Sequence, residues 1–209
     1  MNRPTRVLLA IVLLASLWLT FARVRGQEPT DPLVEALVTA MRREVAVGSP
    51  TPLPVRHCRN AGPADVASDD PWARCDRRLR AFAQMFIASA ERHDLDPWLL
   101  AAIARQESGY NPHASGRSHA EGGIMQLHPA NAANRAVPFL SSPGYARRCR
   151  DVVGACQEAV VERAAVILET AYQRCSDPRA ALNAYNLGRC DTSWSYAARI
   201  RELRARMMR

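Results

Sequence analysis

Residues 96–112 read DPWLLAAIARQESGYNP, and this stretch decides the kind of fold that the chain adopts. Asp96 and Pro97 suit the cap and the first position of a helix. The residues that follow are apolar on nearly every side, and a helix of this kind is buried on most of its faces. Gly109 ends the helix, and the Asn-Pro pair after it turns the chain away. The stretch therefore predicts a central buried helix whose last turn lies at an opening in the domain.

Glu107 occupies that last turn. The C-terminal end of a helix dipole disfavours negative charge, and burial beside an apolar core disfavours it too. Both effects raise the pKa of a carboxyl group and keep it protonated near neutral pH, as a general acid requires. A lone glutamate of this kind is more often a surface residue near a helix end, but two later clusters favour the catalytic interpretation.

The second cluster is Gly122-Gly123-Ile124-Met125-Gln126. The glycines permit a sharp bend or a close approach of the backbone to a ligand. Met125 offers an adaptable apolar surface, and Gln126 carries two hydrogen-bond donors and an acceptor. The combination suits a sugar ring with an N-acetyl group. On the residues alone, a core role for Met125 and a helix-capping role for Gln126 remain equally open.

The third cluster, residues 181–188, reads ALNAYNLG. The hydroxyl of Tyr185 is expected to reach a carboxyl group while its ring packs. Asn186 is suited to hydrogen-bonding sugar hydroxyls or amides. The alternative is a packed tyrosine with an asparagine that ends the helix before Gly188.

In this order, the Glu-Ser, Gly-x-Met-Gln and Ala-Tyr-Asn motifs resemble those of soluble-lytic-transglycosylase-type (SLT) domains, from roughly Ala81 to Leu203. The resemblance implies a mainly α, lysozyme-like helical domain that binds peptidoglycan glycan strands. It implies cleavage of the MurNAc-GlcNAc β-1,4 bond with formation of 1,6-anhydroMurNAc, without a metal or cofactor. Glu107 is then the catalytic acid, and the implied substrate-binding residues are Ser108, Met125, Gln126, Tyr185 and Asn186.

Two other functions stay open on the sequence. A goose-type lysozyme-like hydrolase would need a second carboxylate opposite Glu107, for which Glu121 is the nearby candidate, although a solvated loop charge is the simpler interpretation of it. A non-catalytic wall-binding assembly protein is disfavoured, because Glu107, Gln126 and Tyr185 are all intact. The family often has methionine at the position of His128, which is expected only to cap or pack here.

The N-terminal 70 residues divide into two regions. Residues 1–26 have a basic start and an uncharged run of sixteen residues, Val7–Ala22, which predicts an export signal. A cleaved signal and an uncleaved inner-membrane anchor both remain open, since a spanning helix needs about 17 residues. Residues 27–70 hold a short helix, from Asp31 to about Val45, and a proline-rich linker. Residues 71–209 form the expected catalytic domain, and the expected location is the periplasm.

Helical spacing dominates the expected catalytic domain, and strand signals are scarce. Helices are expected from Pro71, from Pro97, near Pro129–Arg135, up to Tyr172, from Pro178 and around Tyr196, with an irregular segment over Pro138–Arg150.

Six cysteines predict disulfides in an exported chain, and their spacing does not suggest zinc. Cys156 and Cys175 flank a helix that would separate them by about 28 Å, too far for a disulfide. A bridge between Cys149 and Cys156 is expected instead.

The net charge of +8 comes from arginine alone, since the chain has no lysine. It suits an anionic wall polymer or membrane face. Nucleic acid is not expected, because the arginines are scattered and the chain carries an export signal. Wall turnover, a secretion or conjugation machine, and a phage origin are left open as biological roles.

Overall fold

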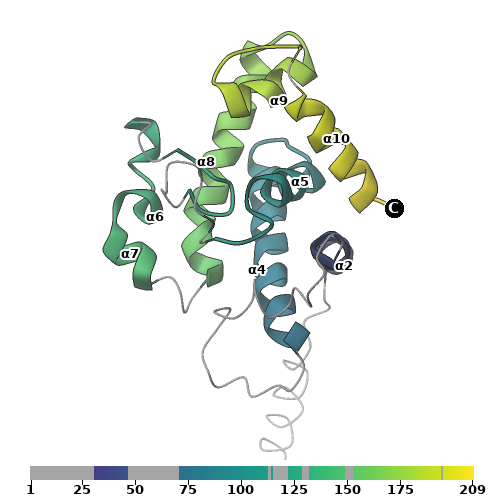
Figure 1. Cartoon of the computed structure of the whole chain (residues 1–209), viewed down its shortest axis with the longest axis vertical. Coiled ribbons are helices and arrows are strands. Elements are labelled where there is room, and N and C mark those ends of the chain that lie inside the picture. Colours follow the sequence, from purple (N-terminus) through teal and green to yellow (C-terminus); the bar gives the residue numbers. More distant parts are fainter. Residues whose placement is uncertain are drawn as a thin grey trace, which may run out of the picture. The chain divides into compact units, whose positions relative to one another are not determined.

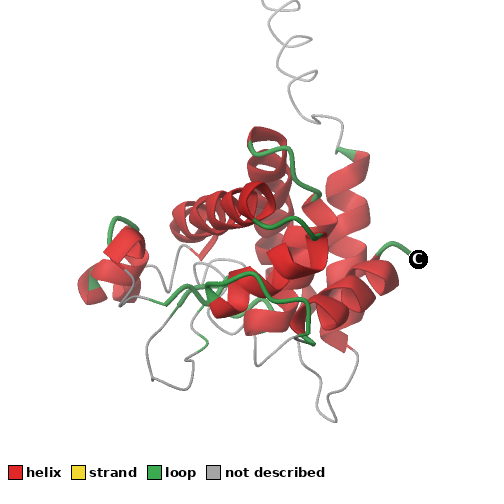
Figure 2. Ribbon diagram, turned by 90° about the horizontal axis from the view of Figure 1, so that it is seen from above, coloured by secondary structure: helices red, strands yellow, loops and turns green. Residues whose placement is uncertain are grey.

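The computed structural model describes residues 31–46, 71–112, 114, 122–128, 132–148, 153–193 and 195–209. Leu33–Arg209 forms one compact unit. Its elements are α2 (Pro32–Ala46), α4 (Pro71–Arg92), α5 (Pro97–Ser108), the 3-10 turn η1 (Ala132–Asn134), α6 (Pro138–Ser141), α7 (Pro143–Arg148), α8 (Val153–Arg174), α9 (Pro178–Leu187) and α10 (Tyr196–Met207). Within these ranges there is no strand (Figure 2), so the prediction of a mainly α fold is confirmed.

Helix α5 is the central element and packs against α4 and α10, while α8 packs against α4 (Figure 1). The Asp96 carboxylate caps it by accepting a hydrogen bond of 3.0 Å from the backbone N–H of Trp98. Gly109 ends it in the left-handed conformation, with φ of 61°, and donates its N–H to the carbonyl of Arg105. All six residues from Leu99 to Ala104 are buried. The predicted central helix is therefore confirmed.

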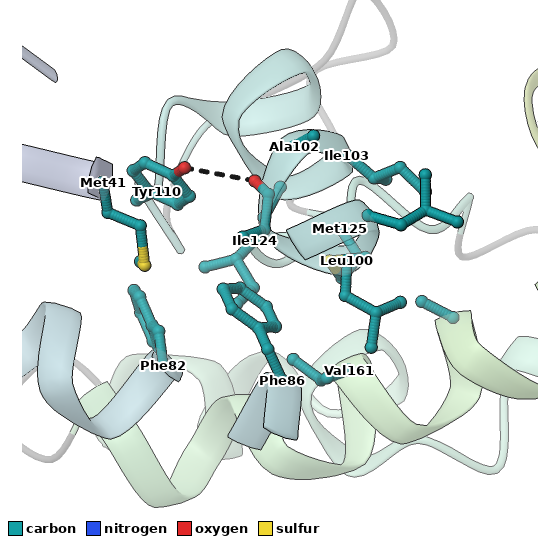
Figure 3. Packing of buried hydrophobic residues seen from close by; sticks show 14 of the residues in the cluster. Met41, Phe82, Phe86, Leu100, Ala102, Ile103, Tyr110, Ile124, Met125 and Val161 are labelled. Carbon is teal, nitrogen blue, oxygen red and sulfur yellow. Dashed lines mark hydrogen bonds between the residues drawn. The ribbon is translucent and has the colours of Figure 1, made fainter. Parts of the chain in front are cut away.

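The core around α5 is apolar and closely packed (Figure 3). Phe82 and Phe86 of α4 lie with their ring centroids 6.5 Å apart. The hydroxyl of Tyr110 is buried there and donates to the carbonyl of Ala101 at 3.1 Å, which satisfies its polar group. Because α5 is held on several sides, its last turn has a fixed position in the domain.

Helix α2 packs within the same unit as residues 71–209. Leu37 and Met41 are fully buried in its contact with the core. The Glu44 carboxylate is 7% exposed and pairs with the guanidinium of Arg206 at 3.1 Å. Removing this helix would therefore expose core surface and leave Arg206 without the Glu44 carboxylate. Val7–Ala22 and the proline-rich linker lie outside the described residues, and none of the described helices is long and apolar enough to span a membrane.

The segment expected to be irregular, Pro138–Arg150, instead forms helices α6 and α7 as far as Arg148. Each begins with a proline, whose fixed φ and missing N–H suit the first position of a helix. Val137 offers no capping side chain to α6, so the sequence signal is weak. The short helix expected near Pro129–Arg135 is confined to η1 in the described part of the chain.

A disulfide joins Cys175, after α8, to Cys190, after α9, with 5.7 Å between the Cα atoms. It ties the two ends of the α8–α9 corner together, and the predicted use of cysteines in disulfides is confirmed. Cys75 and Cys156 are also disulfide-bonded. Cys149, the expected partner of Cys156, lies outside the described residues, so that pairing stays a prediction.

Candidate active site

Glu107 lies in the last turn of α5 with its side chain partly buried. Its Oε1 accepts a hydrogen bond of 2.6 Å from the hydroxyl of Tyr196, the first residue of α10. Tyr196 is only 1% exposed, so the hydroxyl has little freedom to leave the carboxyl group. The carboxyl group of Glu107 is thus held by a residue 89 positions later in the chain.

Burial raises the pKa of Glu107 above its usual value. The hydrogen bond from Tyr196 and the positive charge of Arg199 act in the opposite direction and are smaller. The direction predicted from the sequence is confirmed, and burial is the main cause. A raised pKa keeps the proton on Glu107 to higher pH, which suits a general acid.

Ser108 connects α5 to the glycine-containing cluster. Its hydroxyl oxygen lies 2.8 Å from the carbonyl oxygen of Ile124 and 3.1 Å from that of Ala104. The Ser108 hydroxyl therefore serves to position the 122–127 turn beside Glu107. The substrate-binding role that the resemblance implies for it stays a prediction.

The backbone of residues 122–127 folds back on itself, with the N–H of Leu127 donating to the carbonyl of Gly122 at 2.8 Å. A Cβ on Gly122 would lie 2.7 Å from the backbone of Gln126, and one on Gly123 would lie 2.7 Å from Oε1 of Gln157. Gly123 also has a φ of +66°. The two glycines are therefore required by the turn itself.

Met125 and Gln126 both support this turn. Met125 is fully buried in the core (Figure 3). Nε2 of Gln126 donates to the carbonyls of Ala114 and Gly123, each at 2.9 Å. Both amide donors are thus used within the protein, and the predicted contacts of these two residues with a sugar remain untested.

Tyr185 makes a different hydrogen bond from the expected one. Its hydroxyl donates to the carbonyl of Met125 at 2.8 Å, while Tyr196 supplies the bond to the Glu107 carboxyl group. The rings of Tyr185 and Tyr196 stack, with centroids 6.4 Å apart and planes at 17°. Burial and the nearby Glu107 raise the pKa of both phenols, so both stay protonated donors. Asn186 is exposed on α9.

Asn183 is a site-forming residue that the sequence interpretation missed. Its side chain is fully buried, donates from Nδ2 to the carbonyl of Asp191 at 2.5 Å, and accepts at Oδ1 from the N–H of Ala197 at 2.8 Å. It fixes the start of α10 and hence the position of Tyr196. An asparagine on the apolar face of a helix was the available signal.

The other candidates from the sequence are Glu121, His128 and a metal site, and the described part of the chain assigns none of them a role beside Glu107. Glu121 lies outside it. The side chain of His128 is exposed, and its carbonyl accepts from Nδ2 of Asn134 at 3.1 Å. Within the described ranges no cluster of histidine, cysteine, aspartate and glutamate is arranged to hold a metal ion.

The transglycosylase SLT domain family matches residues 84–202, a range that contains Glu107 and all the hydrogen bonds around it. No curated protein and no solved structure matches the chain.

Proposed function

The chain belongs to the transglycosylase SLT domain family, and we propose that it is a peptidoglycan lytic transglycosylase that cleaves the MurNAc-GlcNAc β-1,4 bond. The observation that carries the proposal is the state of Glu107. Its carboxyl group lies at the end of a buried helix, has a raised pKa and accepts a hydrogen bond from Tyr196. This is the environment that a general acid for glycosidic cleavage needs.

In the proposed reaction Glu107 acts twice. Its carboxylic acid donates a proton to the glycosidic oxygen as the bond from that oxygen to C1 of MurNAc breaks. The resulting carboxylate then takes the proton of the C6 hydroxyl of the same sugar, and O6 bonds to C1. The products are a free 4-hydroxyl and a 1,6-anhydro ring, no water is consumed, and Glu107 ends protonated as it began.

Tyr196 is a positioning residue in this scheme. Its hydroxyl donates to Oε1, so the hydrogen bond strengthens when the carboxyl group becomes a carboxylate. It therefore stabilises the state between the two proton transfers. The positive charge of Arg199 acts in the same direction.

The charges around Glu107 favour this mechanism over hydrolysis. Two-carboxylate glycosidases place the second group about 5 to 9.5 Å from the first. Among the described residues, the charged neighbour that shifts the pKa of Glu107 is a cation, Arg199, and not a second carboxylate. Glu121, the candidate second carboxylate for hydrolysis, lies outside the described residues.

We place the enzyme outside the cytoplasm, in the periplasm, either soluble or held by its N-terminus. Disulfides persist in oxidising compartments. The Cys175–Cys190 bridge and the disulfide-bonded Cys75 and Cys156 support that location, as does the apolar run near the N-terminus.

Mass spectrometry of digested wall sacculi tests the reaction. A protein of residues 31–209 keeps α2 and is the shortest suitable version. It should release muropeptides with 1,6-anhydroMurNAc ends, which are lighter by one water than reducing ends, and Glu107→Gln should release none. Reducing ends alone would show that the chain is a hydrolase.

A further inference from the structure

A cavity of about 880 Å³ lies apart from Glu107, at the other end of α5. It is bounded by the α4–α5 loop, the end of α8, the start of α9 and one side of α10. Asp96, at its edge, precedes Glu107 by eleven residues, which is about 16 Å along the helix. The cavity is therefore not part of the catalytic site.

The charged side chains that line the cavity are balanced, with four of each sign when His93 is protonated. Six of these side chains pair with one another in three ion pairs. His93 lies 2.8 Å from Glu169, Arg179 lies 3.8 Å from Asp177, and Arg204 pairs with Asp96. These pairs shape the walls and leave little net charge for a ligand.

The remaining two charged side chains, Asp94 and Arg201, do not form an ion pair with each other. Within the described residues, the side chains of Asp94 and Arg201 have neither a hydrogen bond nor an ion pair. Both are exposed to solvent at the cavity. The hydroxyl of Tyr172, a partly buried residue, likewise has no protein partner there. One anion, one cation and one hydroxyl are therefore free to bind a ligand.

The apolar part of the wall comes from Leu95, Leu99 and Leu182. Leu99 and Leu182 are 7% and 3% exposed, so the apolar wall belongs to the packed core. A ligand that fits must combine small apolar groups with one ammonium and one carboxylate. A polyanion would meet the carboxylates of the wall, and a neutral glycan would leave both free charges unused.

We propose that this cavity binds the peptide stem of the wall polymer, as a site separate from the one that cuts the glycan. The choice of ligand rests on the proposed function, because it is the wall substrate that carries peptides with ammonium and carboxylate groups. Arg201 pairs with a stem carboxylate, Asp94 with a stem ammonium, and the leucines contact the small side chains. Such a site would hold the enzyme on peptide-bearing wall regions while Glu107 acts on the sugar.

Titration calorimetry with a synthetic wall-stem tetrapeptide, free of sugar, tests this site apart from catalysis. Wild type and Glu107→Gln should bind it with equal affinity, because the catalytic acid is not involved. Arg201→Glu and Asp94→Asn should each weaken binding by about two- to fivefold, as expected for one lost charge pair between exposed groups. Asparagine is chosen for position 94 because its φ of 50° is one that asparagine tolerates.

Arg77→Glu is the matched control. Arg77 is an exposed arginine on α4 outside the cavity, so its reversal changes the net charge equally and should leave binding unchanged. Acetylating the peptide amine should weaken binding to wild type but not to Asp94→Asn. Amidating the peptide carboxylates should weaken binding to wild type but not to Arg201→Glu.

Three results would overturn the proposal: no binding of the peptide, equal loss in the Arg77 control, or binding of peptide-free glycan that Arg201→Glu abolishes. None of them would bear on the Glu107 chemistry. Conversely, peptide binding by a chain that releases only reducing ends would support this site and contradict the proposed transglycosylase.

Discussion

The hydroxyl of Tyr196 lies 2.6 Å from Oε1 of Glu107, although 89 residues of sequence separate them. The bond joins the end of α5 to the start of α10. At the opposite ends of the two helices, Asp96 pairs with Arg204, so α5 and α10 are antiparallel neighbours. A carboxyl group that the sequence places at a helix end is thereby given one orientation.

Tyr196→Phe should raise the pKa of Glu107 further, because it removes a hydrogen bond that lowers it. Activity of a general acid is lost as pH rises through its pKa, so the basic limb of the pH–rate profile should move to higher pH. At neutral pH the rate should fall by about tenfold or more, within the range of acid–base effects. An unchanged profile would show that the bond does not tune the acid.

Tyr185→Phe is the matched comparison. Its hydroxyl donates to the carbonyl of Met125 and not to the carboxyl group. We expect a loss of stability of about 1 to 3 kcal/mol from the unsatisfied carbonyl, with little movement of the pH profile. A shift as large as that of Tyr196→Phe would contradict the assignment of roles.

Glu107→Gln should lower the rate of turnover by a factor of about 10² to 10⁴ or more, because glutamine keeps the shape but cannot donate a proton as an acid. Glycan binding should persist, which pull-down on sacculi would measure. Glu121→Gln on the same sacculi should be nearly silent. If the Glu121 variant is the inactive one, or both are, the mechanism with a single acid is wrong.

Gly123→Ala should destabilise the protein more than Gly188→Ala. Both positions have a positive φ, which costs an alanine about 1 to 2 kcal/mol. At Gly123 the new Cβ would also meet Gln157 and Val160 at 2.7 and 2.8 Å, which adds about 1 to 3 kcal/mol, whereas at Gly188 nothing lies within 4 Å. Urea unfolding of both variants measures the difference, and equal losses would show that the turn can relax.

Replacing Cys175 and Cys190 together by serine should lower the free energy of unfolding by about 3 kcal/mol, the loop-entropy value for a closed loop of 15 residues. Reductant should lower the melting temperature of the wild type at least as much, since Cys75 and Cys156 are also bonded. Thiol titration before reduction is the check on the starting state. Six titratable thiols and an unchanged melting curve would show that the cysteines are free.

Stability should depend on pH through His93, which contacts Glu162 at 2.9 Å and Glu169 at 2.8 Å. These bonds, that to Glu162 first, raise the pKa of His93 above its usual 6.5. Its contribution is complete below 6.5 and is lost as pH rises through the higher folded value. Hydrogen bonds, first from Arg92, lower the pKa of Glu162 to about 2, so its contribution is present above 4.5 and is lost as pH falls toward 2.

The contribution of His93 and Glu162 to the melting temperature should therefore be largest between about pH 4.5 and 6.5. His93→Gln should lower it there and converge toward the wild-type curve at alkaline pH. A constant difference between the two curves across the alkaline range would show that the histidine acts only through packing.

The sequence by itself determined the central helix and its ends. Asp96, Pro97 and Gly109 act on the backbone within a few residues of themselves, and the apolar run between them leaves burial as the stable outcome. The same reasoning gave the position of Glu107 and the direction of its pKa, because the caps set its place in the helix and the apolar run beside it predicts burial. It failed at α6 and α7, which begin with proline but are only four and six residues long, and Val137 offers α6 no side-chain cap.

Only the tertiary structure decided which side chain meets the carboxyl group. Tyr196 is buried and Tyr185 partly buried, and their rings stack, so sequence spacing does not say which hydroxyl faces Glu107. That choice depends on how Asn183 fixes the start of α10 and on the Met125 carbonyl that takes the other hydroxyl. Both are contacts between segments distant in the chain, and their distances are set by the packing of whole helices, which no local pattern encodes.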